Sequence, residues 1–206
     1  MKKYFAALTT TALISAAPFA LAASSTDLTV KGIITPEACT PNLSNGGIVD
    51  NGKISSKDLK QTNPTLIGKH TLTLTVKCDA AIPFALHSID NRNGSAAYSS
   101  RYGLGLINGT QKLGGYSLIL SNLIADGAPA QPIASYDGET NWFGENNWDP
   151  DLYMSVGAVG GDSQPIAVQD LTLDLLVETL IARADGLDLT NEVNIDGSAT
   201  LELKYL

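Results

Sequence analysis

Apolar and polar residues alternate along much of this chain with the period of two that places successive side chains on opposite faces of a β-strand. Between positions 71 and 78 the even positions carry Leu, Leu, Val and Cys, whereas the odd positions carry Thr, Thr, Thr and Lys. This pattern predicts a half-buried strand over residues 66–78. The end of the chain repeats the pattern and predicts a second such strand over 198–206, with one face formed by Ala199, Leu201, Leu203 and Tyr205.

Other segments have the same strand character. The pattern predicts them at residues 28–33, 82–89, 102–107, 115–124, 152–159 and 166–181. Residues 171–184 could also form an amphipathic helix, but apolar positions alternate over eleven residues there, which favours a strand. The stretch 126–150 has no such run, and a connection of that length is either functional or a sign that an element has been missed.

About eight strands separated by Gly, Asn and Asp turns predict an all-β sandwich. One of these turns is Asn108-Gly109, a dipeptide typical of tight hairpins. Neither an internal repeat nor a linker divides the chain, so we expect a single domain over residues 23–206.

Residues 1–22 have the features of a secretory signal peptide. Lys2 and Lys3 precede an apolar stretch that is too short to span a bilayer, and Ala20-Leu21-Ala22 supplies the small residues that signal peptidase requires. We expect cleavage between Ala22 and Ala23, export to the periplasm, and no membrane span in the remaining chain. In an oxidising compartment the single cysteine pair, Cys39 and Cys78, is expected to form one disulfide.

The composition, the net charge and the lack of catalytic motifs argue against several classes of function. Of the 206 residues, 44% are hydrophobic and 17% are charged, as in globular proteins, and the net charge is −8. An acidic protein is a poor partner for a phosphate backbone, so nucleic acid is not expected as a ligand. The only histidines are His70 and His87, and motifs for a nucleophile elbow, a phosphate loop or a zincin site do not occur. We therefore expect a protein that is not an enzyme and holds no cofactor or metal.

Both tryptophans of the chain lie in a segment rich in carboxylates and amides. Flat rings beside such groups can bind a sugar, so the segment is a candidate ligand loop. The alternative, which we favour, is a long connection whose rings pack over the end of the sandwich. The candidate residues are Tyr136, Asp137, Trp142, Asn146, Asn147, Trp148, Asp149 and Tyr153.

Both ends of the predicted domain resemble subunits of chaperone–usher pili. Residues 28–40, with the sequence LTVKGIITPEACT, are similar to the opening strand of pilins, and residues 196–206, DGSATLELKYL, to their terminal strand with its penultimate tyrosine. The resemblance is closer still to an uncharacterised family of secreted fimbrial-like proteins that share the Asp-Gly-Ser-Ala-Thr-Leu-Glu-Leu ending. It covers the two ends of the chain well and the middle hardly at all.

This resemblance implies an immunoglobulin-like, pilin-type sandwich that lacks its last strand and carries one disulfide between its first two strands. The family fills the resulting groove with a strand from a periplasmic chaperone and later with one from another subunit, at an usher in the outer membrane. The residues implied to line this acceptor groove and form the terminal strand are Ala199, Leu201, Leu203, Tyr205 and Leu206.

The residues before the first strand depart from the family's pattern. Only Ala23-Ser24-Ser25-Thr26-Asp27 lie between the expected cleavage site and Leu28, and these small or polar side chains cannot fill a hydrophobic groove. We therefore expect a tip or non-polymerising fimbrial subunit, at the cell surface or secreted, that accepts a strand and donates none. The alternative is a secreted β-sandwich module that binds a carbohydrate, such as a host glycan, or another ligand through the loop from Trp142 to Tyr153.

Overall fold

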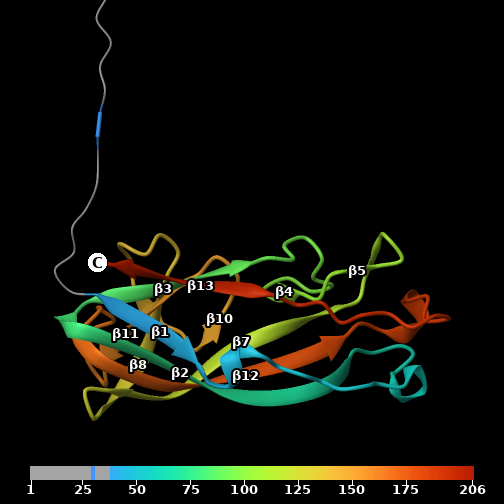
Figure 1. The fold of residues 1–206 in the computed structure, drawn as a ribbon, viewed down its shortest axis with the longest axis horizontal. Helices are drawn as coiled ribbons and strands as arrows, with labels where there is room; N and C mark the ends of the chain where they lie inside the picture. The colour runs from blue at the N-terminus through green and yellow to red at the C-terminus, as the bar shows by residue number, and fades with distance from the viewer. Residues whose placement is uncertain (1–28, 31–37) are drawn as a thin grey trace, which may run out of the picture. The chain divides into compact units, whose positions relative to one another are not determined.

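The computed structural model describes residues 29–30 and 38–206, and these contain two layers of antiparallel strands (Figure 1). The first layer runs in the order β1 (Cys39–Leu43), β2 (Thr65–Ile82), β12 (Val168–Ile181) and β7 (Gly114–Ala125). The second runs in the order β8 (Ala128–Ser135), β11 (Tyr153–Ala158), β3 (Phe84–Asp90) and β13 (Ala199–Tyr205).

Shorter strands lie beside this framework. Within the described residues, helical structure is limited to three single-turn 3-10 segments at 44–47, 56–58 and 184–186. Two short strands pair with β7 and a third pairs with β8, while the remaining two form a separate hairpin. In that order they are β4 (Tyr102–Gly103) and β10 (Asn147–Trp148), β9 (Phe143–Gly144), and β5 (Leu106–Ile107) with β6 (Gln111–Lys112).

The long strands of the first layer follow the alternation in the sequence. Every second side chain of β12 from Leu171 to Ile181 is only 2 to 6% exposed, and their partners Leu72, Leu74 and Val76 of β2 are 0 to 7% exposed. These side chains pack against the inward residues of the second layer, including Leu86 and Met154. Apolar burial of this kind contributes about 25 cal/mol per Å², so the alternation itself determines which face of each strand points inward.

The two layers are continuous on one side and separate on the other. A tight turn at Asp126-Gly127, with φ of 50° and 80°, joins β7 to β8 and carries the chain from one layer to the other. Positive φ at two successive residues is the geometry that favours Asp-Gly in hairpins. On the opposite side the layers end at β1 and β13, and no described strand lies between these two.

These findings confirm the all-β sandwich and the Cys39–Cys78 disulfide, which links β1 to β2 at directly opposed positions. The strands predicted at 66–78, 82–89, 115–124, 152–159, 166–181 and 198–206 are also confirmed, with ends shifted by a few residues. A helix over 171–184 is wrong, because β12 occupies most of that segment. The Asn108-Gly109 turn is confirmed between β5 and β6.

Two strand assignments need correction. The stretch 126–150 has no alternating run, which left open whether it is a functional loop or hides an element, and the structure places β8, β9 and β10 in it. Pro129 and Pro132 obscured β8 in the sequence, since proline cannot donate to a ladder and usually argues against a strand. The predicted strand 102–107 is two short strands interrupted at Gly105, where φ is 81°.

The expected signal peptide, its cleavage site and most of the strand at 28–33 lie outside the described residues. Within the described part of the chain, no helix is long and apolar enough to cross a membrane.

Candidate functional site

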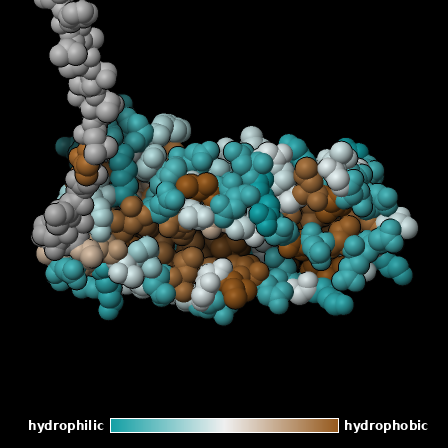
Figure 2. Space-filling view, turned by 45° about the horizontal axis from the view of Figure 1, so that its top comes forward, coloured by the Kyte–Doolittle hydropathy of each residue, from teal (hydrophilic) through white to brown (hydrophobic). Residues whose placement is uncertain are grey.

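The two strands at the ends of the layers each have only one neighbour among the described residues. β1 pairs with β2 alone and β13 pairs with β3 alone, so each presents a free edge. Both edges border the same side of the sandwich, where apolar surface shows between polar rims (Figure 2). We call the depression between them the edge groove.

The central part of the edge groove has a volume of about 260 Å³. Leu43 of β1 and Leu201 of β13 contribute to opposite walls, and the floor comes from inward side chains of β2, β12 and β7. Small residues widen it, since Gly197 and Ala199 stand where larger side chains would project into the space. The floor residues are Leu72, Leu118, Leu175, Val177 and Thr179, together with Leu104 and Tyr116.

Away from the disulfide the edge groove continues into a wider depression of about 520 Å³. Two connecting segments, 49–54 and 189–195, border it, and Leu59, Leu113 and Ile181 lie beneath. Val49, Asn51 and Ile195 line both depressions, so the two are continuous. The Asn51 side-chain oxygen accepts from His70 Nε2 over 3.2 Å, and its side-chain N–H donates to Thr179 Oγ1 over 3.4 Å, so both contacts anchor this segment at the border.

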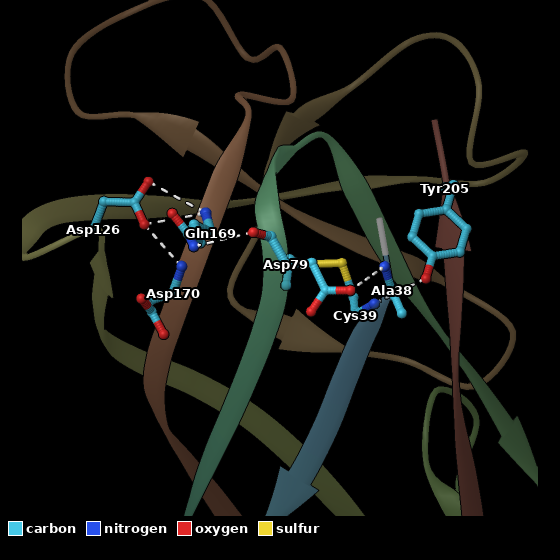
Figure 3. Close-up of a disulfide and its surroundings, with 8 residues drawn as sticks. Ala38, Cys39, Asp79, Asp126, Gln169, Asp170 and Tyr205 are labelled. Carbon is cyan, nitrogen blue, oxygen red and sulfur yellow. Dashed lines mark hydrogen bonds between the residues drawn. A yellow bond between two sulfur atoms is a disulfide. The ribbon is translucent and has the colours of Figure 1, made fainter. Parts of the chain in front are cut away.

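At the disulfide end, the two free edges are joined by a side-chain hydrogen bond. The backbone N–H of Cys39 donates to the Tyr205 hydroxyl over 2.9 Å, across the gap between β1 and β13 (Figure 3). The disulfide fixes this end of β1 to β2, and the N–H of Ala38 donates to the Asp79 carboxylate. The edge groove is therefore closed beside Cys39 and open toward Ala199.

Hydrogen bonds around Asp126 hold the neighbouring strands in register at the same end (Figure 3). Its carboxylate accepts from the backbone N–H groups of Gln169 and Asp170, at the start of β12. The Gln169 side-chain amide donates to the Asp79 carbonyl, one residue beyond Cys78. This chain of contacts ties the β7–β8 turn to the strand that carries the disulfide.

Removing the Tyr205 hydroxyl should loosen this closed end. Tyr205→Phe leaves the Cys39 N–H without its partner, and we expect a loss of about 0.5–1.5 kcal/mol in the free energy of unfolding, measured by urea titration. Hydrogen exchange at the Cys39 amide should also become faster. Tyr98→Phe is the control, because no described group hydrogen-bonds that hydroxyl. Equal stability of the two variants would show that the bond contributes nothing.

The other terminal-strand residues lie as follows. Leu203 packs half-buried against the core, as do Ala199 and Leu201. The backbone N–H of Leu206 donates to the Pro83 carbonyl. Leu206 itself is 41% exposed. The structure thus places Ala199 and Leu201 in the edge groove, Tyr205 at its closed end, and Leu206 just beyond.

The candidate ligand loop does not present its tryptophan rings to solvent. Trp148 is 1% exposed in the main core, and its indole N–H donates to the Leu152 carbonyl over 2.9 Å. Trp142 is buried with Ala85 and Ile133 in a small cluster on the second layer. Both rings therefore pack as plugs and offer no free face for stacking.

Polar residues of the same loop hold its shape. The Asp137 carboxylate accepts from the Thr140 hydroxyl, from the N–H groups of Thr140 and Glu139, and from Ser135, and these bonds hold its pKa well below the usual range. The Glu145 carboxylate accepts from the N–H groups of Asn147 and Asn146, which lowers its pKa. Both carboxylates thus serve local turns.

The remaining loop residues are spread over the second layer. Tyr153 stacks on His87, with ring centroids 4.2 Å apart, and the Lys204 ammonium lies 5.1 Å from the Tyr153 centroid. Tyr136 is 80% exposed, and Asp149 lies near it in a separate hollow described below. The structure therefore divides the predicted loop site among the core, two turns and the surface.

Sequence reasoning did not single out the polar residues of the interior. Tyr102 is fully buried, stacks on Tyr116 at 5.0 Å, and donates to the Ser88 hydroxyl, which donates in turn to the Asp149 carbonyl. Burial raises the pKa of Tyr102 and of Tyr116. The alternation of apolar and polar residues along a strand does not distinguish a buried tyrosine from an exposed one. Only the packing of Tyr102 and Tyr116 in the tertiary structure identifies them as buried.

The described residues include no group of three or more His, Cys, Asp or Glu placed to hold a metal ion. The site that remains is a backbone edge on either side of an apolar groove. Its chemistry is the pairing of N–H and C=O groups with an added strand and the burial of that strand's apolar side chains.

Comparisons with known proteins find relatives along nearly the whole chain. Protein GltF of Escherichia coli (strain K12) is 27% identical over 248 aligned residues, which cover 97% of this chain and 98% of GltF. The uncharacterized protein YhcF of the same strain is 25% identical over 227, covering 91% and 94%. Residues 28–117 match the family described as "Protein of unknown function (DUF1120)". The chain is thus similar to two E. coli proteins whose names describe no activity.

Proposed function

We propose that this protein is an exported fimbrial subunit or fimbrial-like protein that accepts a β-strand from a periplasmic chaperone or from another subunit. The observation that carries the proposal is the edge groove, an apolar depression between β1 and β13 with no described strand in it. In this proposal one extended strand pairs with both edges and places alternate apolar side chains in the groove.

The inward residues of β13 are less buried than those of β12. The inward residues of β12 are almost completely buried, because β2 and β7 flank them on both sides. The corresponding residues of β13, including Leu201 and Leu203, remain half-buried although they pack on the same core. An added strand beside β13 would remove this remaining apolar surface from water, which favours its binding.

The edges themselves also favour a strand as the occupant. A free strand edge presents N–H and C=O groups that pair with any other strand, so proteins normally cover or interrupt such edges. Most side chains that line the groove are aliphatic and a free strand edge borders it on each side, so an extended segment that pairs with these edges fits it better than a helix. Its closure at Tyr205 fixes one end of the bound segment, and its open end leads to the wider depression beside Leu189 and Val193.

The resemblance of residues 28–40 and 196–206 to pilins supports the fimbrial part of the proposal. It also supports the view that the protein is a tip or non-polymerising subunit, since residues 23–27 lack the apolar side chains of a donor strand. Those residues lie outside the described part of the chain. The purified protein should therefore give no heat-resistant dimer of its own, and such a dimer would contradict this part.

Co-expression with a periplasmic pilus chaperone tests strand acceptance. We expect a one-to-one complex by size-exclusion chromatography with light scattering. In that complex, amides of β1 and β13 should exchange hydrogen more slowly than in the free protein. Leu201→Arg should reduce the yield of complex at least about tenfold, because it introduces an unpaired charge into the apolar groove. Glu202→Arg is the matched control, since Glu202 is exposed and its side chain points to the opposite face of β13 from Leu201, so this variant should bind normally.

Two results would contradict strand acceptance. One is a complex in which the β1 and β13 amides exchange as fast as before. The other is equal binding by the two arginine variants. If Leu201→Arg does not fold, the exchange measurement on the unmodified protein still decides the question.

A further inference from the structure

We propose that a second site on this protein binds a neutral saccharide. It is a hollow of about 500 Å³ at the turn that follows β3, and we call it the tyrosine hollow. Tyr98, Arg101, Tyr136, Asp149 and Asp151 contribute its ring, guanidinium and carboxylate groups. This volume lies in the range of small-molecule sites. The inference stands apart from strand acceptance, because no residue that lines the tyrosine hollow lines the edge groove.

Tyr136 supplies an aromatic face in the tyrosine hollow. It is 80% exposed, the most exposed of the aromatic residues described, and its ring lies against Phe143 with centroids 5.4 Å apart. Phe143 is partly buried on the core, so it supports the tyrosine ring from one side. A ring held in this way binds a ligand with little loss of side-chain entropy. The apolar C–H face of a sugar ring is the ligand surface that such a ring stacks against.

The hollow also carries the polar groups that bind hydroxyls. Neither Asp149 nor Asp151 forms an ion pair within residues 38–206, and no side chain among these residues hydrogen-bonds either carboxylate. Each carboxylate can accept two hydrogen bonds from adjacent hydroxyls. Arg101 donates one N–H to Ser117 and lines the hollow with the rest of its side chain.

The backbone beneath these groups is fixed before any ligand binds. The Asp151 N–H donates to the Ser88 carbonyl, and the Leu152 N–H donates to the Asp149 carbonyl, which holds the turn that carries both carboxylates. On the facing side, the buried Asp90 carboxylate accepts from the N–H groups of Arg92 and Gly103. A site with positions fixed in this way spends little of its binding energy on ordering loops.

The charge of the hollow selects among ligands. The carboxylates of Asp90, Asp149 and Asp151 outnumber the single Arg101 guanidinium and leave the hollow net negative, so an anionic sugar should be repelled and a neutral hexose or N-acetylhexosamine accepted. The hollow is open to solvent and has no enclosed apolar chamber, which disfavours a lipid or another fully hydrophobic ligand. These features together point to a neutral saccharide.

Saturation-transfer difference NMR on the full protein tests the proposal. The probes are methyl α-mannopyranoside, methyl β-galactopyranoside and N-acetylglucosamine, each at millimolar concentration, with N-acetylneuraminic acid as the anionic comparator. We expect saturation transfer to at least one neutral sugar and none to the acid. Tyr136→Ala should weaken binding about tenfold through loss of the stacking face, and Asp149→Asn together with Asp151→Asn should do the same.

Val159→Ala is the matched control, because Val159 is well exposed and lies outside the tyrosine hollow. It should bind like the unmodified protein. No transfer to any of the three neutral sugars would overturn the proposal, as would transfer that Tyr136→Ala leaves unchanged. Leu201→Arg should leave sugar binding intact, and Tyr136→Ala should leave chaperone binding intact, so failure of one proposal is distinguishable from failure of the other.

Discussion

Replacing Trp148 by alanine is expected to lower the free energy of unfolding by about 3–5 kcal/mol. The indole is 1% exposed and belongs to the main core. Its removal would leave a cavity between the layers, because the backbone around it is held by pairing of β10 with Leu118 and Ile119 of β7. The lost hydrogen bond to the Leu152 carbonyl adds to the cost, since that oxygen would remain buried without this partner.

Urea titration followed by circular dichroism measures this change. Tyr136→Ala in the same loop is the matched control, and we expect it to change the free energy of unfolding by no more than about 0.5 kcal/mol, because its ring is exposed. If Trp148→Ala unfolds at the same urea concentration as the unmodified protein, the ring is not a structural plug. A sugar-binding role for that ring would then need reconsideration.

Removing the disulfide is expected to have an effect of similar size. Cys39→Ser combined with Cys78→Ser opens a loop with a sequence separation of 39 residues. Cross-linking a loop of this length reduces the entropy of the unfolded chain by an amount equivalent to about 4 kcal/mol at 25 °C. The oxidised protein should therefore be more stable than the double variant by about that amount.

Comparison of three samples separates the bond from the side chains. The oxidised protein, the reduced protein and the double serine variant are unfolded in urea, and the last two should have similar midpoints. The slope of the free energy against urea should be larger without the bond, because the unfolded chain exposes more surface. A difference below about 1 kcal/mol between oxidised and reduced protein would contradict the expectation.

The strand faces were predictable from the sequence because burial follows the period of two. The alternation from position 71 to 78 and from Leu171 to Ile181 gave the correct inward faces of β2 and β12. β8 was missed because two prolines interrupt its pattern, and its pairing with β7 depends on the Asp126-Gly127 turn. The disulfide was predictable because the chain has only two cysteines and the sequence predicts export to an oxidising compartment.

The functional sites were less accessible to sequence reasoning. The pattern at Ala199 and Leu201 predicted an apolar face, but no local pattern shows that β13 pairs with only one strand among the described residues. Trp142 and Trp148 appeared suitable for a ligand because their loop is polar, whereas the fold turns both rings inward. Tyr136 belongs to the same loop and points outward, so composition did not separate it from them.

The sequence by itself determined the all-β class, the inward face of each long strand and the single disulfide. Each of these depends on local periodicity or on a residue count. Only the tertiary structure decided that β1 and β13 border one groove, that Tyr205 joins them at Cys39, and that the tyrosine hollow gathers residues from three separate segments. The physical reason is that these features are contacts between residues distant in the chain, and such contacts depend on strand order and register, which alternation within one strand does not specify.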